Sequence, residues 1–268
     1  MKTIRNKALI VLSVFFGFLY SSCQKEINSE QPISGNQATL DRRPVQTFYG
    51  PTIPIGEGVA RAWVSQNPNG VPIAVGINLS EKALENLPGD PRQFVFNFPN
   101  HGATHFFTHM LVDWNPQGHE PAGVYDVPHF DFHFYTVSNS FRLGIGPNDS
   151  TQFANEPDSQ YVPPMYFRIP GGVPQMGAHW IDLLSDEFNG GPFTKTFILG
   201  SYDGEFIFWE PMITRAYLLS HPDDNIPLRQ PAAFKHDGWY PQSYRIKYSD
   251  RPGEYSVALT DLRFHQGQ

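Results

Sequence analysis

The sequence predicts an all-β protein: a single β-sandwich or β-barrel domain with long loops and only short helices. Strand-like runs recur along the chain with turn signals between them. Glycine (23 residues), proline (25 residues) and aromatic residues (15%) are abundant, whereas charged residues make up 17% of the chain. This composition favours many short strands over long helices. The alternation of strands and helices that is typical of parallel sheets does not occur in the sequence.

The first 22 residues have the features of a signal peptide. Basic residues precede an apolar run at residues 8–20, which is too short to span a bilayer comfortably. Two serines then precede Cys23, the only cysteine of the chain, in an arrangement that resembles the lipobox of bacterial lipoproteins. We therefore expect cleavage before Cys23 and lipidation of this residue. An ordinary signal peptide followed by an incidental cysteine is the alternative.

Residues 23–45 are polar and contain no aromatic residue, so we expect a flexible tether between the lipid and a β-rich domain at residues 46–268. This organisation predicts a cell-envelope protein, namely an outer-membrane lipoprotein that faces the periplasm or the cell surface and whose partner is the membrane. The net charge of −7 argues against a nucleic-acid partner, because binding to phosphates requires a basic surface.

The first part of the domain predicts a hairpin and a short helix. Residues 59–66 and 71–80 flank an Asn-Pro-Asn-Gly turn, which is typical of two paired strands. We expect a short helix next, with Ser80 as its N-terminal cap and Pro88 at its end. Two runs with alternating apolar residues predict further strands, at residues 93–98 and 104–114.

The second part of the domain predicts two more hairpins. Residues 193–214 contain two strand-like runs around Asp203-Gly204, and residues 244–264 contain two around Pro252-Gly253. Two segments rich in turn-forming residues predict long loops, at residues 113–128 and 139–164. Long loops in a compact domain are commonly functional. The role of residues 216–268 does not follow from the sequence.

Residues 128–135 (PHFDFHFY) carry the clearest pattern for chemistry. Ionisable and phenylalanine side chains alternate there, and successive side chains of a strand point to opposite faces. His129, Asp131 and His133 should therefore share one face. Neighbours on that face lie about 6.6 Å apart, whereas the two histidines lie about 13 Å apart along the strand. A single ion would use one adjacent pair and take its third ligand from elsewhere.

His179, which follows a Gly/Pro turn, is the expected third ligand. A His-x-Asp pair with a distant histidine is typical of the facial triad that holds Fe(II), and zinc uses the same donors. Glu210 lies among apolar residues, so we expect it to act as a fourth ligand or general base. His119 and Glu120 are expected as outer partners of a ligating histidine. In the alternative, these side chains form a buried polar network without a cofactor.

Four stretches together resemble a known family: GVARAWVSQNPNGVPIAVGINLSEKALENLP, DWNPQGHEPAGVYDVPHFDFHFY, PGGVPQMGAHWID and TFILGSYDGEFIFWEPMIT. They are similar to bacterial exported proteins grouped as a domain of unknown function, which a thermophile protein under extracytoplasmic sigma-factor control typifies. The resemblance implies a β-rich, secreted protein that can be a homo-oligomer, and it implies no reaction. The motif residues stand where the family pattern has them: His119, Glu120, His129, Asp131, His133, His179 and Glu210.

Two hypotheses follow. In the first, a lipid-anchored envelope protein binds a divalent transition metal, iron or zinc, through the histidine and carboxylate residues, beside a phenylalanine-lined cavity that can admit a small-molecule ligand. In the second, the protein is a non-catalytic envelope stress or binding protein, or an oligomeric structural protein, and the same residues only organise its core. Whether the protein is an enzyme stays open.

Overall fold

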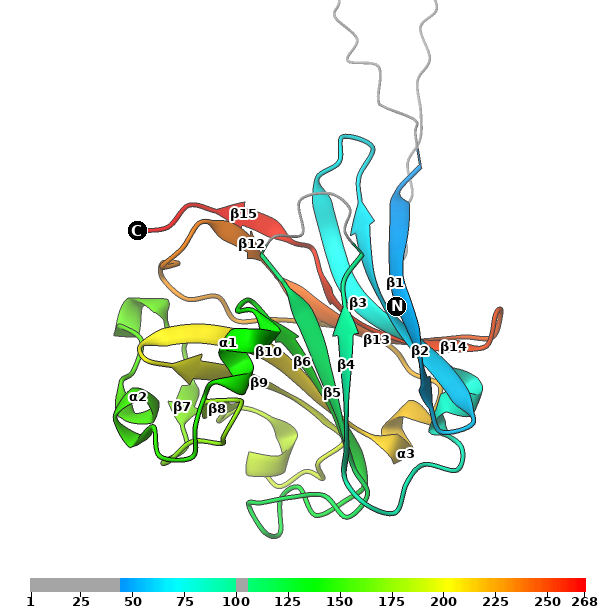
Figure 1. The fold of residues 1–268 in the computed structure, drawn as a ribbon, viewed down its shortest axis with the longest axis horizontal. Helices are drawn as coiled ribbons and strands as arrows, with labels where there is room; N and C mark the ends of the chain where they lie inside the picture. The colour runs from blue at the N-terminus through cyan, green and yellow to red at the C-terminus, as the bar shows by residue number, and fades with distance from the viewer. Residues whose placement is uncertain (1–43, 100–105) are drawn as a thin grey trace, which may run out of the picture. The chain divides into compact units, whose positions relative to one another are not determined.

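The computed structural model of the protein describes residues 44–99 and 106–268 (Figure 1). The described residues form antiparallel sheets joined by turns and short helices, which confirms the all-β prediction. The predicted signal peptide, Cys23 and nearly all of the predicted tether lie outside the described residues. Among the residues that are described, no helix has both the length and the apolar character needed to cross a bilayer.

The first sheet has six strands in the order β1-β2-β3-β14-β13-β11, and every neighbouring pair is antiparallel. Its strands are β1 (Gln46–Ile55), β2 (Gly58–Gln66), β3 (Pro72–Ser80), β11 (Asp223–Pro227), β13 (Ser243–Ser249) and β14 (Glu254–Thr260). The C-terminal part of the chain, whose role the sequence does not predict, thus completes the sheet that the N-terminal strands begin.

The second sheet has seven antiparallel strands in the order β4-β5-β6-β10-β9-β8-β7. Its strands are β4 (Arg92–Asn97), β5 (His109–Asn115), β6 (His129–Tyr135), β7 (Tyr166–Arg168), β8 (Ala178–Asp182), β9 (Lys195–Tyr202) and β10 (Glu205–Thr214). A separate two-stranded sheet pairs β12 (Gly238–Tyr240) with β15 (Arg263–His265). Two large sheets of this kind favour the sandwich over the barrel.

The helices of the described residues are all short. They are the α-helices α1 (Asn139–Leu143), α2 (Ser150–Ala154) and α3 (Arg215–Leu218), and the 3₁₀ helices η1 (Glu81–Leu84), η2 (Ser159–Tyr161) and η3 (Asp186–Phe188). The helix predicted after β3 is the 3₁₀ helix η1. Ser80 precedes it, but its side chain does not cap the helix, because the Ser80 Oγ accepts a hydrogen bond from the Val59 N–H instead.

The three predicted hairpins are present as β2–β3, β9–β10 and β13–β14. Asp203 and Gly204 between β9 and β10 both have positive φ, 51° and 79°, as the favoured two-residue hairpin turns require. The strand predicted at residues 104–114 is shorter than expected, because β5 begins only at His109. Phe106 and Phe107 leave the strand and pack edge to face against each other.

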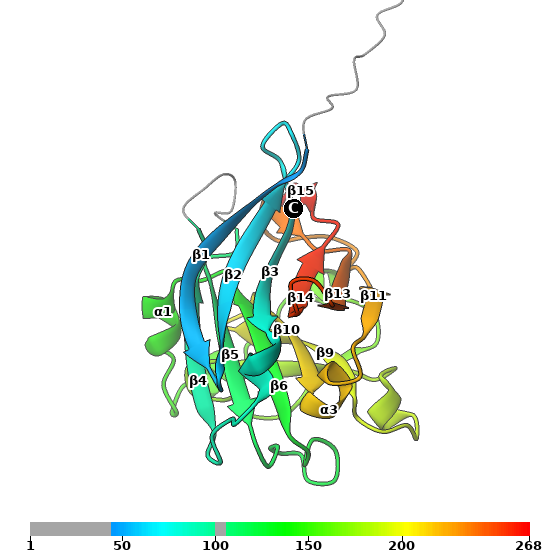
Figure 2. The ribbon, with the colours of Figure 1, turned by 90° about the vertical axis from the view of Figure 1, so that its right-hand side faces the viewer.

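The main hydrophobic core lies between the two large sheets. Figures 1 and 2 show these sheets from two directions. From the first sheet it receives Ile77 and Val257, among others, and from the second sheet it receives the phenylalanines of β6. Phe130, Phe132 and Phe134 are all fully buried. Burial of three large aromatic side chains contributes much of the driving force that holds β6 in the middle of the second sheet.

The opposite face of the second sheet, called the outer face here, carries the ionisable residues of β6. Two smaller apolar clusters lie on this face: one contains Tyr135 and Phe208, and the other contains Tyr125 and Met212. The first cluster includes Ile145 and Phe153 from the connection after β6, and the second includes Val124 and Tyr125 from the connection before it. The predicted loops 113–128 and 139–164 thus help to cover the outer face of the sheet.

The outermost strand of the first sheet, β1, is irregular. Its pairing with β2 shifts register between Tyr49 and Thr52, and prolines occupy positions 51 and 54. At the other edge of this sheet, β11 begins with Asp223 and Asp224 and ends with a proline. In the second sheet the edge strand β7 has only three residues.

Candidate metal centre

Strand β6 presents its ionisable residues on the outer face, as the alternation predicts. His129, Asp131 and His133 are nevertheless 0%, 4% and 1% exposed, because the connecting segments cover them. The sheet register places Asp113 of β5 beside Asp131 on one side and Met212 of β10 beside it on the other. Ionisable groups so removed from water must be paired, neutral or bound to a cation.

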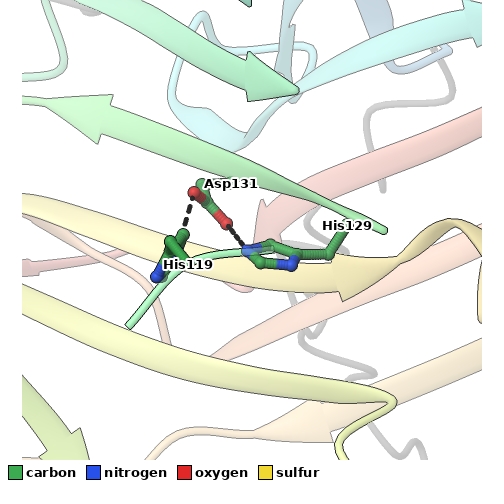
Figure 3. Close-up of side chains that lie close together, drawn as sticks. All are labelled: His119, His129 and Asp131. Carbon is green, nitrogen blue, oxygen red and sulfur yellow. Dashed lines mark ion pairs between the residues drawn. The ribbon is translucent and has the colours of Figure 1, made fainter. Parts of the chain in front are cut away.

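The first group of potential ligands consists of His119, His129 and Asp131 (Figure 3). His129 Nε2 lies 3.2 Å from Asp131 Oδ1, and His119 Nε2 lies 3.4 Å from Asp131 Oδ2. One ligand atom of each residue lies within 4.8 Å of the others. His119 comes from the loop between β5 and β6, which folds back so that its exposed histidine meets the buried pair.

Backbone carbonyls fix the orientation of both histidine rings. His129 Nδ1 lies 2.7 Å from the Val127 carbonyl oxygen, and His119 Nδ1 lies 2.7 Å from that of Glu120. A carbonyl oxygen only accepts hydrogen bonds, so each Nδ1 carries the proton. In a neutral ring Nε2 then holds a lone pair, and both lone pairs are directed at the carboxylate of Asp131. Three acceptors face one another at this point.

The surroundings keep Asp131 ionised. Burial alone would raise the pKa of Asp131, but the hydrogen bonds and charges that protonated rings of His119 and His129 would supply outweigh burial and lower that pKa well below its usual value. Burial lowers the pKa of His119, whereas the hydrogen bond and charge of Asp131 raise it more strongly, so the net pKa is raised. Asn115 adds a hydrogen bond from Nδ2 to Asp131 Oδ2 at 2.7 Å.

The second group consists of His133, His179 and Glu210, from β6, β8 and β10. His133 Nε2 lies 3.3 Å from Glu210 Oε1, and His179 Nε2 lies 4.0 Å from Glu210 Oε2. Glu210 is 2% exposed. Both ring nitrogens of His133 and the Oε2 atom of Glu210 have no hydrogen-bond partner among the described residues.

Burial favours the neutral form of all three residues in the second group. It lowers the pKa of His133 to about 3 and that of His179 to about 4. It also raises the pKa of Glu210 well above its usual value, and the charges of Asp131 and Asp113 raise it further. Both imidazoles are therefore unprotonated at neutral pH, which is the form that binds metal ions.

Asp113 is a site residue that the sequence does not single out. Burial, followed by the charge of Asp131, raises its pKa to about 8. Its Oδ2 atom lies 4.0 Å from His133 Nδ1, the side of the ring that faces away from Glu210. The sequence could have indicated Asp113 through the alternation in residues 109–115. This alternation places Asp113 and Asn115 on the face opposite to Val112 and Trp114.

Members of both groups line one cavity of about 840 Å³. His119, Asp131, His133, His179 and Glu210 contribute to its wall, together with apolar side chains and the loop of residues 169–173. The apolar lining consists of isoleucine, valine, methionine and proline residues, with Tyr125. The expectation of a phenylalanine-lined cavity is wrong, because Phe130, Phe132 and Phe134 point into the core on the opposite face.

The structure divides the predicted ligands between two groups. His179 joins His133 and Glu210 rather than the His129-Asp131 pair that was expected to form the triad with it. His119, expected as an outer partner, contributes its own Nε2 atom to the first group. Glu120 is exposed, and its contact with His119 uses the backbone carbonyl. No single point collects all five predicted ligands.

A family model described as TTHB210-like, hypothetical protein TTHB210, matches residues 68–114. Over this stretch the chain is similar to an uncharacterised family that a thermophile protein typifies, as the resemblance in the sequence predicts. The matched stretch includes Asp113 but no member of either ligand group. No curated protein and no solved structure matches the chain significantly. Export and sigma-factor control stay predictions.

Proposed function

We propose that this protein is a lipid-anchored cell-envelope protein whose β-domain binds a divalent transition metal ion through His119, His129 and Asp131. The observation that carries the proposal is the orientation of the two rings: backbone carbonyls hold each Nδ1, and each Nε2 faces the same carboxylate. An imidazole that uses its Nδ1 hydrogen for an outer hydrogen bond and its Nε2 for the metal is the usual arrangement in metal sites.

The donor set suits zinc or iron. Two imidazoles and one carboxylate are the protein ligands of many catalytic zinc sites and of non-haem Fe(II) sites, and both leave coordination positions for water or substrate. His119 is exposed and lines the cavity, so these positions would be reachable for a small molecule. The ion would act as a Lewis acid on such a ligand.

The unpaired buried atoms also favour a cation. His129 Nε2 and Asp131 Oδ1 are buried and have no hydrogen-bond partner among the described residues. Leaving one such group unsatisfied costs about 1–3 kcal/mol. A divalent ion between the three side chains would satisfy these atoms together and neutralise the Asp131 charge.

The alternative function is a non-catalytic binding or structural protein, in which the first group only organises the fold. One observation favours it: the pKa of His119 is raised by Asp131, so a protonated His119 could donate to the carboxylate. Asn115 already supplies a further donor. In that case the three side chains form a polar network that has no need of an ion.

Elemental analysis separates the two functions. The full-length protein is purified in detergent without chelator or histidine tag, and its metal content is measured by mass spectrometry. We expect at least about one equivalent of zinc or iron per chain, reduced by about one equivalent in His129→Ala. His109→Ala is the matched control, since His109 is a buried histidine of the same sheet that contacts Thr108 and Tyr135 instead.

Equal metal content in wild type and His129→Ala would contradict the metal proposal and leave the polar network.

The envelope part of the proposal has its own test. The sequence before residue 24 supports lipidation of Cys23, so wild-type protein should sediment with the membrane fraction of the cell. Cys23→Ser should be recovered in the supernatant, and sedimentation of both proteins would contradict the anchor.

A further inference from the structure

We propose that His133, His179 and Glu210 form a second metal-ion site, separate from the first and open to the same cavity. The second site goes beyond the proposed function, because its ligands, its supporting residues and its test are distinct from those of His119, His129 and Asp131. Like the first site, it offers two imidazoles and one carboxylate, so its ligand is a divalent transition metal ion such as Zn²⁺ or Fe²⁺.

Three strands place these ligands around one point. His133 on β6 and Glu210 on β10 are neighbours, since the pairs Trp209–Phe134 and Met212–Asp131 flank them in the sheet. His179 reaches the same point from β8, on the far side of β9. A ligand atom from each residue lies within 4.8 Å of the other two. Small side-chain adjustments would bring all three to the bond length of about 2 Å that zinc requires.

The polar atoms at this point are buried without partners. His133 is 1% exposed and Glu210 is 2% exposed, yet both nitrogens of His133 and Oε2 of Glu210 have no hydrogen-bond partner among the described residues. Buried polar groups are almost always paired, and exceptions call for an explanation such as an ion. A protonated Glu210 could pair with His133 Nε2, 3.3 Å from its Oε1, whereas an ion at this point would engage His133, His179 and Glu210 together.

Aromatic packing holds both imidazoles toward Glu210. The Phe208 ring lies edge-on to His133 and to His179, with centroid distances of 4.9 and 5.4 Å. Gly200 makes room for it, because a Cβ atom there would lie 1.9 Å from the Phe208 ring. Tyr135 lies nearly parallel to His133 at 5.8 Å. Ligands that are held in place by packing lose little freedom when an ion binds.

One ion cannot serve both groups. His129 and His133 are separated by four positions on the strand, about 13 Å, and they belong to different groups. Ligand atoms bound to the same zinc ion are at most about 4 Å apart, since each bond is about 2 Å long. The two groups therefore predict two ions in neighbouring positions along β6.

The cavity gives the second site a route to solvent. His179 is the least buried of its three ligands, and it lines the cavity wall beside Met176 and the loop of residues 169–173. His133 and Glu210 line the same cavity from the sheet. An ion can thus enter from the cavity without opening of the core between the sheets.

The test is a zinc titration of the full-length protein in detergent, after removal of bound metal with a chelator and desalting. Bound zinc is counted by calorimetry and by mass spectrometry. We expect about two equivalents in wild type, about one in His179→Ala, and two in His109→Ala, the buried histidine outside both groups. Because His179 is only partly buried, its substitution should be tolerated. Glu210→Gln, which keeps the size of the side chain, provides a second variant with the same expected loss.

The outcomes separate this inference from the proposed function. Zinc binding that is unchanged in His179→Ala and Glu210→Gln overturns the second site, even if His129→Ala loses one equivalent and the first site stands. Loss in His179→Ala and Glu210→Gln without loss in His129→Ala supports the second site and overturns the first. A wild-type protein that binds no zinc overturns both.

Discussion

The two faces of strand β6 differ in what buries them and in how completely their side chains are satisfied. On the core face, Phe130, Phe132 and Phe134 pack against both sheets as apolar groups with no polar atom to satisfy. On the outer face, His129 and His133 are equally buried, yet they retain unpaired nitrogen atoms. The comparison teaches that the core face fixes the position of the strand, while the outer face buries polar atoms that the described residues leave without hydrogen-bond partners.

The largest expected effect concerns the core face. Phe132→Ala removes a fully buried ring from the main core and should lower the free energy of unfolding by about 3–5 kcal/mol. Chemical denaturation of the metal-free protein measures this change. Phe264→Ala is the control, because Phe264 is 53% exposed and its loss should cost within about 0.5 kcal/mol. Similar losses in both variants would show that β6 is not anchored through its phenylalanines.

The next effect concerns Gly200, which leaves room for the Phe208 ring on the outer face. Gly200→Ala forces the Phe208 ring to move and should destabilise the protein by about 1–3 kcal/mol, as overpacking does. Because Phe208 packs on His133 and His179, zinc affinity of the second group should fall as well. Gly89→Ala is the control, since a Cβ atom there has no neighbour within 4 Å. Unchanged zinc affinity in Gly200→Ala would show that Phe208 does not position the histidines.

A smaller effect is expected from the hydrogen bond behind Asp131. Asn115→Ala removes the donor to Asp131 Oδ2 and should raise the dissociation constant of the ion at the first group by about 10–100-fold. Binding at the second group should stay unchanged. Calorimetric zinc titration resolves the two. Equal weakening at both groups would mean that they act as one site.

The smallest expected effect is a change in pH dependence. The pKa of Asp113 is raised from 3.8 to about 8, so between these pH values the folded protein holds a proton that the unfolded chain has released. Stability of the metal-free protein therefore falls as pH rises through this range. Asp113→Asn should flatten that decline, and denaturation at a series of pH values measures it. Parallel curves for both proteins would contradict a protonated Asp113.

Local patterns predict much of this fold. The alternation of residues 128–135 and the Asp203-Gly204 turn correctly indicate a two-faced strand and a hairpin, because both depend on neighbours in sequence. Ser80 shows the limit of such patterns. Its hydroxyl could cap the following turn, but the nearby β2 strand offers the Val59 N–H instead.

The division of the ligands depends on contacts between distant segments. The spacing along β6 predicts that one ion cannot use both His129 and His133, and the two residues fall in different groups. Which partner each histidine takes follows from the order β6-β10-β9-β8, which brings His179 to Glu210, and from the return of the loop that carries His119. Neither the strand order nor the loop conformation is contained in the spacing of the motif.

The irregular outer strands bear on how copies of this protein can associate. A long, regular edge strand invites a second chain to add its own strand, which leads to fibres or domain exchange. The register shift and prolines of β1, the paired aspartates and final proline of β11, and the brevity of β7 disfavour this addition. At these edges, an oligomer would therefore assemble through side-chain contacts. Even closely packed copies of the protein would not join their edge strands into one continuous sheet there.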